Sequence, residues 1–286
     1  MTRHFLTGEE LTRDELLALI DRAMELKADR SASRALEGKS VALVFELAST
    51  RTRVSFEVGV NELGGSPIVL REGELQLSRG ESVRDTALVL SRYVHAIGVR
   101  TGPHNLLEEL SDSSSVPVIN MLTHDHHPCQ GLADLMTLRE RFGELDGLRV
   151  AYVGDGNNMA RSLRAMGATV GVDVVLASPE ELALPGAPNH EPGEAAAGAD
   201  ALYTDVWVSM GDEEEAERRR ELLAPYRIDE DLLSRAAPNA VVLHCLPAHP
   251  GEEITEEVLY GERSAVWDQA ENRLHSQKAL LELLIS

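Results

Sequence analysis

Short apolar runs alternate along this chain with longer stretches in which apolar residues recur every three or four positions. The short runs predict buried strands, and the longer stretches predict amphipathic helices. In the first half we expect strands at 41–45, 67–70, 96–99 and 116–120, separated by helices at 54–63, 83–93 and 105–110. In the second half we expect strands at 148–153, 172–176, 201–204 and 240–244, with helices at 159–166, 213–223, 230–236 and 269–284. This alternation predicts an α/β fold of parallel β-sheets flanked by helices.

The remaining segments complete the predicted architecture. Thr12 and Glu15 form a capping-box pattern ahead of an apolar helical stripe, and a further helix is expected at 130–141. A chain of 286 residues is long enough for two domains. We therefore expect a first domain at 1–129, a second domain at 130–268 with a hinge around helix 130–141, and a C-terminal helix at 269–286 that returns to the first domain.

Composition narrows the classes of function. Hydrophobic residues make up 43% of the chain, with no charged-then-apolar leader and no apolar run near the ~20 residues that a membrane span requires. We expect a cytoplasmic protein. The formal net charge of −21 disfavours binding to nucleic acid or to an anionic membrane, although local arginines could still bind an anionic substrate. Lys27, Lys39 and Lys278 are the only lysines, so arginine carries nearly all the positive charge.

The pentapeptide Ser-Thr-Arg-Thr-Arg at 49–53 lies between a predicted strand and a predicted helix. Hydroxyls, guanidiniums and the backbone N–H groups of a helix N-terminus are all donors that suit phosphate oxygens. An anion site is one interpretation, and a helix cap beside two surface arginines is the other. Arg100 follows the predicted strand 96–99, so its side chain should project at the carboxyl edge of the sheet, where parallel sheets bind ligands.

Gly154-Asp155-Gly156 follows a predicted strand and precedes a helix, which is the context of a dinucleotide-binding turn. Met159 stands where the third glycine of that motif would be. The next strand, 172–176, ends in Leu-Ala-Ser, with no acidic residue at that end to hold a ribose. These departures disfavour a nucleotide. Asn157 and Asn158 could instead hold a carboxylate at the helix start, or could simply cap the helix.

Histidine and cysteine are concentrated at 124–130, His-Asp-His-His-Pro-Cys-Gln, and again at His244-Cys245. Such residues can bind zinc, but the first group is nearly contiguous and lacks a spaced second pair unless His244-Cys245 supplies it. The alternative is that His127 donates a hydrogen bond in a site, with Pro128 setting the loop and Gln130 starting a helix beside it. We predict no metal and no cofactor.

Three further polar groups follow or open predicted elements of the second half. Asp205 begins the segment Asp-Val-Trp-Val-Ser-Met-Gly at a strand end, where its carboxylate could pair with an ammonium group or merely cap the chain. The thiol of Cys245, in His-Cys-Leu-Pro at 244–247, could be a nucleophile, a metal ligand or a packed apolar group. Glu-Asn-Arg at 271–273 opens the last helix and could be surface charge alone.

Taken in order, these segments resemble the aspartate/ornithine carbamoyltransferase family over nearly the whole chain, from Arg-His-Phe-Leu near the start to Glu-Asn-Arg near the end. The pentapeptide at 49–53 resembles the carbamoyl phosphate signature of that family. The segments 127–130, 205–211 and 244–247 resemble its ornithine branch. The aspartate branch reads a second carboxylate with cationic residues that include a lysine from a neighbouring subunit. The corresponding segment here, 75–82, contains no lysine.

The resemblance implies transfer of the carbamoyl group of carbamoyl phosphate to the δ-amine of L-ornithine. The phosphate would be bound by Ser49, Thr50, Arg51, Thr52 and, from an adjacent subunit, Gln76. The carbamoyl group would be surrounded by Arg100, His127, Gln130 and Arg273 and by the backbone of Cys245 and Leu246. Ornithine would be held by Asn158, Asp205, Ser209 and Met210. The catalytic residues of this set would be Arg51, Arg100, His127, Asp205 and Cys245.

The resemblance also implies a homo-oligomer, expected to be a trimer, and a role either in arginine biosynthesis or in the catabolic breakdown of citrulline. Two departures from the family are visible. Leu47 stands where the family often has a lysine, so the pocket has one positive charge fewer, and the segment 184–198 is shorter than in the family. Two alternative functions remain: a carbamoyltransferase for another amine, such as putrescine or an acylated ornithine, and a catalytically silent assembly partner.

Overall fold

The computed structural model of the chain describes residues 2–71, 73–74, 80–208 and 213–285. Three predicted site residues, Gln76, Ser209 and Met210, lie outside these ranges. Contacts divide the chain into two compact units, the first formed by Met1–Met136 and Asn272–Ser286 and the second by Thr137–Glu271. The divisions fall inside two helices, α5 (Pro128–Phe142) and α11 (Val266–Ile285).

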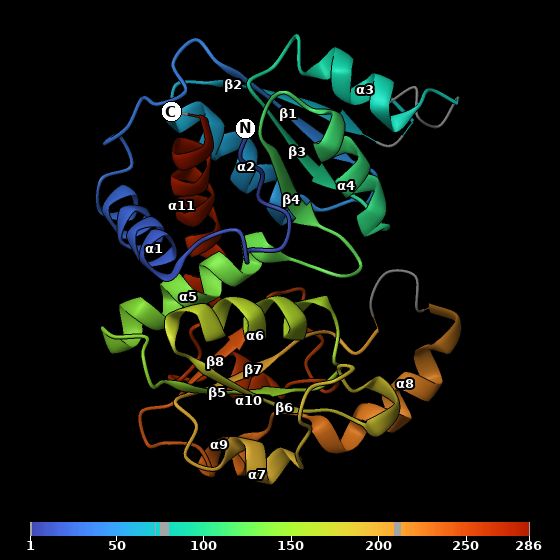
Figure 1. Cartoon of the computed structure of the whole chain (residues 1–286). Coiled ribbons are helices and arrows are strands. Elements are labelled where there is room, and N and C mark those ends of the chain that lie inside the picture. The colour runs from blue at the N-terminus through green and yellow to red at the C-terminus, as the bar shows by residue number, and fades with distance from the viewer. Residues whose placement is uncertain (1, 72, 75–79, 209–212, 286) are drawn as a thin grey trace. The chain divides into compact units, whose positions relative to one another are not determined.

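The first unit is built on a parallel sheet with the strand order β2-β1-β3-β4 (Figure 1). Its strands are β1 (Ser40–Phe45), β2 (Ser66–Arg71), β3 (Ala96–Arg100) and β4 (Val118–Leu122). Its helices are α1 (Arg13–Ala28), α2 (Thr50–Glu62), α3 (Val83–Leu90) and α4 (His104–Ser113), with parts of α5 and α11. The chain steps from β1 outward to β2 and then back to β3 on the other side of β1. Because the winding reverses there, the carboxyl ends of β1 and β3 flank the point where open parallel sheets bind ligands.

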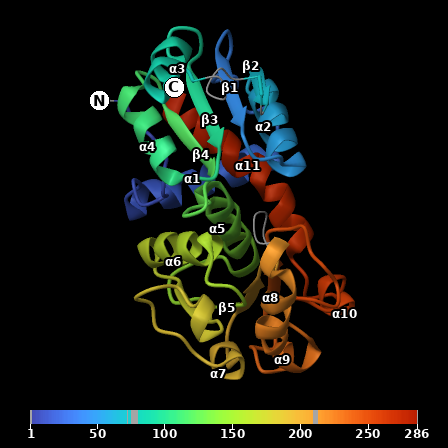
Figure 2. The ribbon, with the colours of Figure 1, turned by 90° about the vertical axis from the view of Figure 1, so that its right-hand side faces the viewer.

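Helices cover both faces of this sheet, as its apolar strands require. Ala42, Val44, Ile97 and Val99 of the sheet share one core cluster with residues of α3 and α4. Figure 2 shows α3 and α4 on one side of the sheet and α2 and α11 on the other. The helices α2 and α11 approach closely, since a Cβ added to Gly59 of α2 would lie only 3.2 Å from a side-chain carbon in α11.

Every lysine of the chain fastens the C-terminal helix to the first unit. Lys27 of α1 donates to the side-chain oxygen of Asn272 (2.8 Å), and Lys39 donates to the backbone oxygen of Ile285 (2.6 Å). Lys278 lies in α11 itself and is 1% exposed. Its Nζ donates to the carboxylate of Glu62 and to the backbone oxygen of Arg30, both at 2.8 Å. The expected return of the last helix to the first domain is therefore confirmed.

The second unit repeats the plan with the strand order β6-β5-β7-β8, again all parallel (Figure 1). Its strands are β5 (Arg149–Val153), β6 (Asp173–Ala177), β7 (Ala201–Thr204) and β8 (Val241–His244). Its helices are α6 (Asn158–Val170), α7 (Pro192–Ala196), α8 (Ala216–Leu223), α9 (Glu230–Ser234) and α10 (Glu256–Leu259), with parts of α5 and α11. The winding reverses between β5 and β7. Residues that follow these two strands therefore occupy the ligand-binding edge of the second sheet.

The core of the second unit is rich in alanine. Ala151 and Val153 of β5 pack in one cluster with residues of α7, α9 and α10, among them Ala195 and Ala196 of α7. Figure 1 shows α7 and α9 on one face of this sheet and α6 on the other. On the α6 face, a Cβ added to Gly167 would lie 3.0 Å from a methyl carbon of Val174 in β6. Small residues thus allow helices to approach both faces of the sheet.

The predicted elements are confirmed, with differences at their ends. The helix predicted at 54–63 begins at Thr50, because Ser49 caps it and brings the Thr-Arg-Thr-Arg residues into the first turn. The strand predicted at 96–99 includes Arg100, which pairs in register with Phe45 of β1. The helix α10 was not predicted, since four residues are too few to show a helical period. Among the described residues, no helix is long and apolar enough to cross a membrane.

The glycine turn after β5 has a structural reason of its own. The backbone nitrogen of Gly156 donates to the backbone oxygen of Leu182 (2.9 Å). A Cβ added to Gly156 would lie 2.5 Å from that oxygen and 2.5 Å from the backbone nitrogen of Leu184. Glycine is required here because another segment of backbone packs against it. This packing explains the glycine, so a nucleotide-binding role is not needed to explain it.

We expect Gly156→Ala to lower the free energy of unfolding by about 1–3 kcal/mol, because the new methyl group meets backbone that cannot rotate away. Gly186→Ala is the matched control: Gly186 also lies in a loop, has a φ of +74°, and has nothing within 4 Å of the added Cβ. That variant should lose only about 1 kcal/mol, from its backbone conformation alone. Urea unfolding of both variants measures the difference. Equal losses would show that the close packing around Gly156 is not limiting.

Candidate functional site

The first group of predicted residues meets where β1 and β3 end. The Oγ of Ser49 accepts a hydrogen bond from the backbone nitrogen of Thr52 (3.3 Å), which starts α2. Thr50 and Arg51 are exposed, whereas Thr52 is fully buried. The first N–H groups of a helix lack intrahelical acceptors and carry partial positive charge. This end of α2 therefore offers backbone, hydroxyl and guanidinium donors to an anion.

A buried chain of hydrogen bonds connects α2, α5 and α11. The guanidinium of Arg273 donates to Oγ1 of Thr52 (2.8 Å) and to Oε1 of Gln130 (3.0 Å). The Nε2 of Gln130 in turn donates to Oδ1 of Asp134 (2.9 Å). All four side chains are at least 96% buried. Charge-assisted bonds of this kind fix geometry, so three of the predicted residues share one rigid arrangement, and Asp134 is a member that sequence reasoning missed.

Arg100 and His127 bring further polarity to the same unit. Arg100 is 7% exposed at the end of β3, and the register between β3 and β4 shifts between Val99 and Arg100. A shift of register can turn a side chain away from its regular direction in the strand. Burial, and then the positive charges of Arg273, Arg100 and Arg51, lower the pKa of His127 well below 6.5. The imidazole is therefore neutral at pH 7 and can donate one hydrogen bond.

The cysteine of the histidine-rich segment is a packing residue. Cys129 is fully buried, its Sγ donates to the backbone oxygen of Asn120 (3.2 Å), and burial raises the pKa of its thiol to about 12. Over the ranges that the structure describes, the groups that could hold a metal are Asp205 with His244 and Cys245, and His249 with Glu252 and Glu253. The segment 124–130 contributes to neither group, so the zinc interpretation gains no support there.

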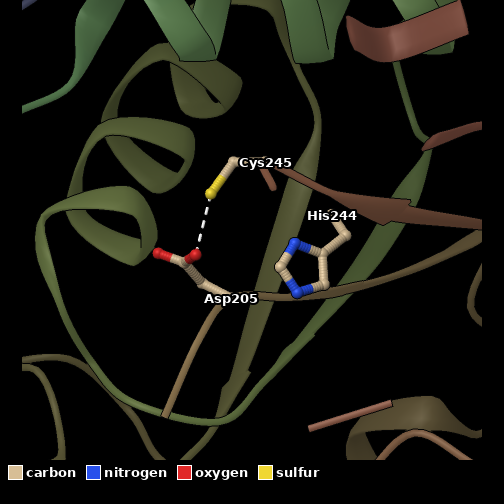
Figure 3. Close-up of side chains that lie close together, drawn as sticks. All are labelled: Asp205, His244 and Cys245. Carbon is tan, nitrogen blue, oxygen red and sulfur yellow. Dashed lines mark hydrogen bonds between the residues drawn. The ribbon is translucent and has the colours of Figure 1, made fainter. Parts of the chain in front are cut away.

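The second group of predicted residues lies at the ligand-binding edge of the second sheet. Asp205 directly follows β7 and is 7% exposed. Its carboxylate accepts from the backbone nitrogen of Val206 (2.8 Å), from the side chain of Asn157 (2.9 Å) and from Sγ of Cys245 (2.8 Å). Figure 3 shows the thiol of Cys245 pointing toward this carboxylate. A carboxylate held by several donors suits a cationic partner such as an ammonium group.

Asn157 is both a cap and a positioning residue. Its Oδ1 caps α6 by accepting from the backbone nitrogens of Met159 (2.9 Å) and Ala160 (3.3 Å), and it also accepts from the hydroxyl of Tyr152 (2.9 Å). Its Nδ2 is thereby aimed at Asp205. Asn158, the predicted ligand residue, is the first residue of α6 and is half-buried. An amide at a helix N-terminus can hold a carboxylate.

The turn after β8 has an unusual backbone. Leu246 has a φ of 61°, and its peptide bond to Pro247 is cis. The backbone nitrogen of Leu246 donates to Nδ1 of His244 (2.9 Å), while Nε2 of His244 lies 3.0 Å from Oε1 of Glu253. Figure 3 shows the His244 ring near Asp205 and Cys245, but both ring nitrogens already have partners in hydrogen bonds. A metal at these three residues would have to displace one of them.

Comparison with known proteins covers both units. Residues 3–140 match the family model described as the aspartate/ornithine carbamoyltransferase carbamoyl-P binding domain, and residues 146–284 match its Asp/Orn binding domain. The chain belongs to the aspartate/ornithine carbamoyltransferase family. The carbamoyl-P binding domain of the family matches the unit that holds donors for an anion. The Asp/Orn binding domain matches the unit that holds a carboxylate suited to an ammonium group.

Individual members of the carbamoyltransferase family are similar over their whole length. The ornithine carbamoyltransferase of Acidothermus cellulolyticus is 54% identical over 303 residues, covering 100% of this chain and 97% of that protein. The structure of ornithine carbamoyltransferase from Pyrococcus furiosus is 45% identical with a TM-score of 0.94, covering 99% of this chain and 97% of that one. A mutant N-acetyl-L-ornithine transcarbamylase complexed with PALAO is 32% identical with a TM-score of 0.85, covering 99% and 100%.

We expect His127 to make folding of this carbamoyltransferase pH-dependent. The pKa of its imidazole is about 6.5 when unfolded and well below that when folded, so the unfolded state takes up the proton first. The histidine therefore lowers stability as the pH falls below 6.5, by up to about 1.4 kcal/mol per pH unit. Urea unfolding between pH 7.5 and pH ~5 should show a shallower loss for His127→Gln than for the wild type.

His190→Gln, at an exposed histidine, serves as the control for this measurement. The change in slope caused by His127→Gln is measured against the curve of this variant, which loses a histidine from the surface. Parallel curves for the wild type and His127→Gln would mean that His127 takes up its proton equally in the folded and unfolded states.

Proposed function

We propose that the chain transfers the carbamoyl group of carbamoyl phosphate to the δ-amine of L-ornithine, giving L-citrulline and phosphate. The observation that carries this proposal is the contrast between the two sheet edges. The first unit gathers guanidiniums, hydroxyls and a helix N-terminus where β1 and β3 end. The second unit holds a carboxylate where β7 ends. The named ornithine carbamoyltransferases that resemble the chain over its whole length support the same assignment.

The phosphate is bound at the start of α2. Its ligands are Ser49, Thr50, Arg51 and Thr52, joined by Gln76 of an adjacent subunit. Arg51 is exposed, so its charge is available to a ligand. Leu47 adds no charge where the family often has a lysine, so the arginines of the first unit supply the positive field that neutralises the leaving phosphate.

The carbamoyl group is oriented by Arg100, His127, Gln130 and Arg273, together with the backbone of Cys245 and Leu246. Because Oγ1 of Thr52 accepts from Arg273, the hydroxyl proton of Thr52 remains free to be donated to a carbonyl oxygen. The neutral imidazole of His127 supplies a second donor without placing a further full charge beside the arginines. One well-placed donor to a developing oxyanion is commonly worth about 3 kcal/mol.

Ornithine is held by Asn158, Asp205, Ser209 and Met210, with the thiol of Cys245 beside Asp205. The δ-amine must attack in its neutral form, although amines of this kind are mostly protonated at neutral pH. In the reaction the δ-nitrogen bonds to the carbonyl carbon, the bond from that carbon to the phosphate oxygen breaks, and the departing phosphate accepts the proton from nitrogen. Asp205 orients the amine, and no separate general base is needed.

Trimer formation through the first unit completes the proposal. Five large apolar side chains of this unit are more than two-fifths exposed: Val54, Ile68, Leu88, Val89 and Tyr93. They lie on α2, on the edge strand β2, and on or just after α3. One of them, Val54, lines a pocket of about 360 Å³ together with Ser49, Thr50 and Arg71. Exposed apolar side chains on this unit, one of them beside the phosphate ligands, fit an interface with a neighbouring copy that supplies Gln76. We place this trimer in the cytoplasm, in arginine biosynthesis or citrulline breakdown.

The choice of amine is tested directly by supplying carbamoyl phosphate with L-ornithine, putrescine or N-acetyl-L-ornithine in turn. Putrescine lacks the carboxylate that the amide of Asn158 can hold, and N-acetyl-L-ornithine has a bulkier, uncharged amide in place of the α-ammonium group of ornithine. We therefore expect citrulline formation to exceed the other two products at least tenfold in kcat/KM. A preference for N-acetyl-L-ornithine would move the assignment toward the enzyme of that name, and no product with any amine would favour a silent assembly partner.

Arg51→Ala should lower kcat/KM for citrulline formation by roughly 10²–10³, the loss expected when one cationic donor to the departing group is removed. Arg51 is exposed, so we expect the free energy of unfolding to stay within about 0.5 kcal/mol of the wild type. Arg53→Ala, two residues along the same helix, removes an arginine that is paired with Glu57 (2.8 Å) and should change activity by less than a few-fold. Similar activity in the two variants would contradict the proposed phosphate site.

A further inference from the structure

A fully buried carboxylate lies behind the His-Cys-Leu-Pro turn of the second unit. Glu253 is 0% exposed. Its Oε1 accepts from Nε2 of His244 (3.0 Å) and from the backbone nitrogen of His249 (2.6 Å). Its own backbone oxygen accepts from the backbone nitrogen of Ile228 (2.9 Å), which anchors the segment to the core. Burying a carboxylate costs free energy unless donors meet it, so this side chain is held in one position.

The bond to Glu253 determines which nitrogen of His244 carries the proton. His244 is 1% exposed, and its Nδ1 accepts from the backbone nitrogen of Leu246 (2.9 Å). A neutral imidazole that accepts at Nδ1 must carry its proton on Nε2, the atom that faces Glu253. The backbone nitrogen of His244 is held as well, by Oε1 of Gln269 (2.8 Å). The hydrogen bonds to Glu253, Leu246 and Gln269 therefore fix both the orientation and the tautomer of the His244 ring.

Leu246 needs this support because its backbone is strained. A φ of 61° lies in the left-handed region, which side chains other than glycine and asparagine seldom occupy. Such a conformation persists only where the surroundings hold it. The hydrogen bond from Leu246 to His244 supplies one such restraint, and it acts on the residue that follows Cys245.

We propose that Glu253 is a positioning residue for carbamoyl transfer. It holds His244 in one tautomer, His244 holds the backbone nitrogen of Leu246, and the turn in between presents the Cys245-Leu246 backbone and aims the Cys245 thiol at Asp205. Glu253 is fully buried behind the turn, so it acts through the groups that it holds, the ring of His244 and the backbone of His249. The inference rests on the proposed function, in which the backbone of Cys245 and Leu246 orients the carbamoyl group.

The rival explanation is that Glu253 only stabilises the fold. Two substitutions of His244 separate the two roles. In His244→Asn the side-chain oxygen stands near the place of Nδ1 and can still accept from Leu246, but the link to Glu253 is lost. In His244→Gln the amide reaches toward the place of Nε2 and can still donate to Glu253, but the acceptor for Leu246 is lost. The proposal requires kcat to fall in both variants, because each breaks one link between Glu253 and Leu246. If Glu253 only stabilises the fold, His244→Asn should lose stability and keep the kcat of the wild type.

Substitutions of Glu253 test the same series of hydrogen bonds, from Glu253 through His244 to Leu246. Glu253→Gln keeps an oxygen that accepts from both His244 and His249, so kcat for citrulline formation should stay within about threefold of the wild type. Glu253→Ala removes the acceptor, and kcat should fall at least tenfold with a smaller change in the KM for ornithine. Glu252→Ala is the matched control, because the neighbouring Glu252 pairs with Arg220 (2.9 Å) instead of the turn.

A second readout does not depend on activity. Cys129 is fully buried and Cys245 is half-buried, so the thiol that reacts with a disulfide reagent such as DTNB in the folded protein should be Cys245. Release of the turn breaks the bond from Cys245 to Asp205. We expect Glu253→Ala to react at least fivefold faster than the wild type, with Glu253→Gln and Glu252→Ala unchanged. Circular dichroism of each variant checks that it is folded.

The outcomes are distinguishable from failure of the proposed function. Absence of citrulline formation by the wild type would refute the ornithine assignment, while the thiol measurement would still report on the turn. An active wild type with equal kcat and equal thiol reactivity in Glu253→Ala would refute positioning by Glu253. A kcat in His244→Asn equal to that of the wild type would do the same, because it would show that losing the link to Glu253 does not affect the reaction.

Discussion

The first unit depends on one buried guanidinium. Arg273 is 4% exposed, and a charge removed from water in this way is tolerated only where acceptors meet it in good geometry. Its fork reaches Thr52 on α2 and Gln130 on α5, so three helices from distant parts of the sequence must keep their places for the charge to be satisfied. The same charge helps to keep His127 neutral. Arg273 thus both holds three helices together and sets the charge state of a residue at the anion site.

The two units solve opposite electrostatic problems with the same topology. Each reverses its winding beside its first strand, and each gathers polar side chains at that edge. The first edge concentrates positive charge within a protein of net charge −21, which favours a phosphorylated substrate. The second edge restrains a single carboxylate with Asn157, Val206 and Cys245, which favours an amine. A reaction between an activated anion and an amine needs both environments, and each unit supplies one of them.

Much of this organisation was predictable from the sequence, and the reason differs from residue to residue. Asp205 and Cys245 lie at the ends of consecutive strands, and parallel strands bring such residues to one edge. Gln130 and Asp134 are four positions apart on one helix, a spacing that could have been recognised as a contact.

Other features have no local signal. Thr52 and Arg273 are 221 positions apart, so only resemblance to a family links them before the fold is known. Glu253 is one acid among 48 Asp and Glu residues, and nothing in Gly-Glu-Glu-Ile shows that one of its two acids is buried beneath a histidine. The neutral state of His127 likewise depends on burial and on three arginines that the fold brings to it.

The commitment of every lysine to the C-terminal helix has a practical consequence. Lys27, Lys39 and Lys278 are all hydrogen-bonded at α11, and none of the three is fully exposed. Acylating reagents and bifunctional cross-linkers that attack side-chain amines therefore find few sites while the helix is docked. The rate of lysine acylation becomes a reporter of local opening at the C-terminus, and cross-linking of neighbouring copies is better attempted through the abundant carboxylates.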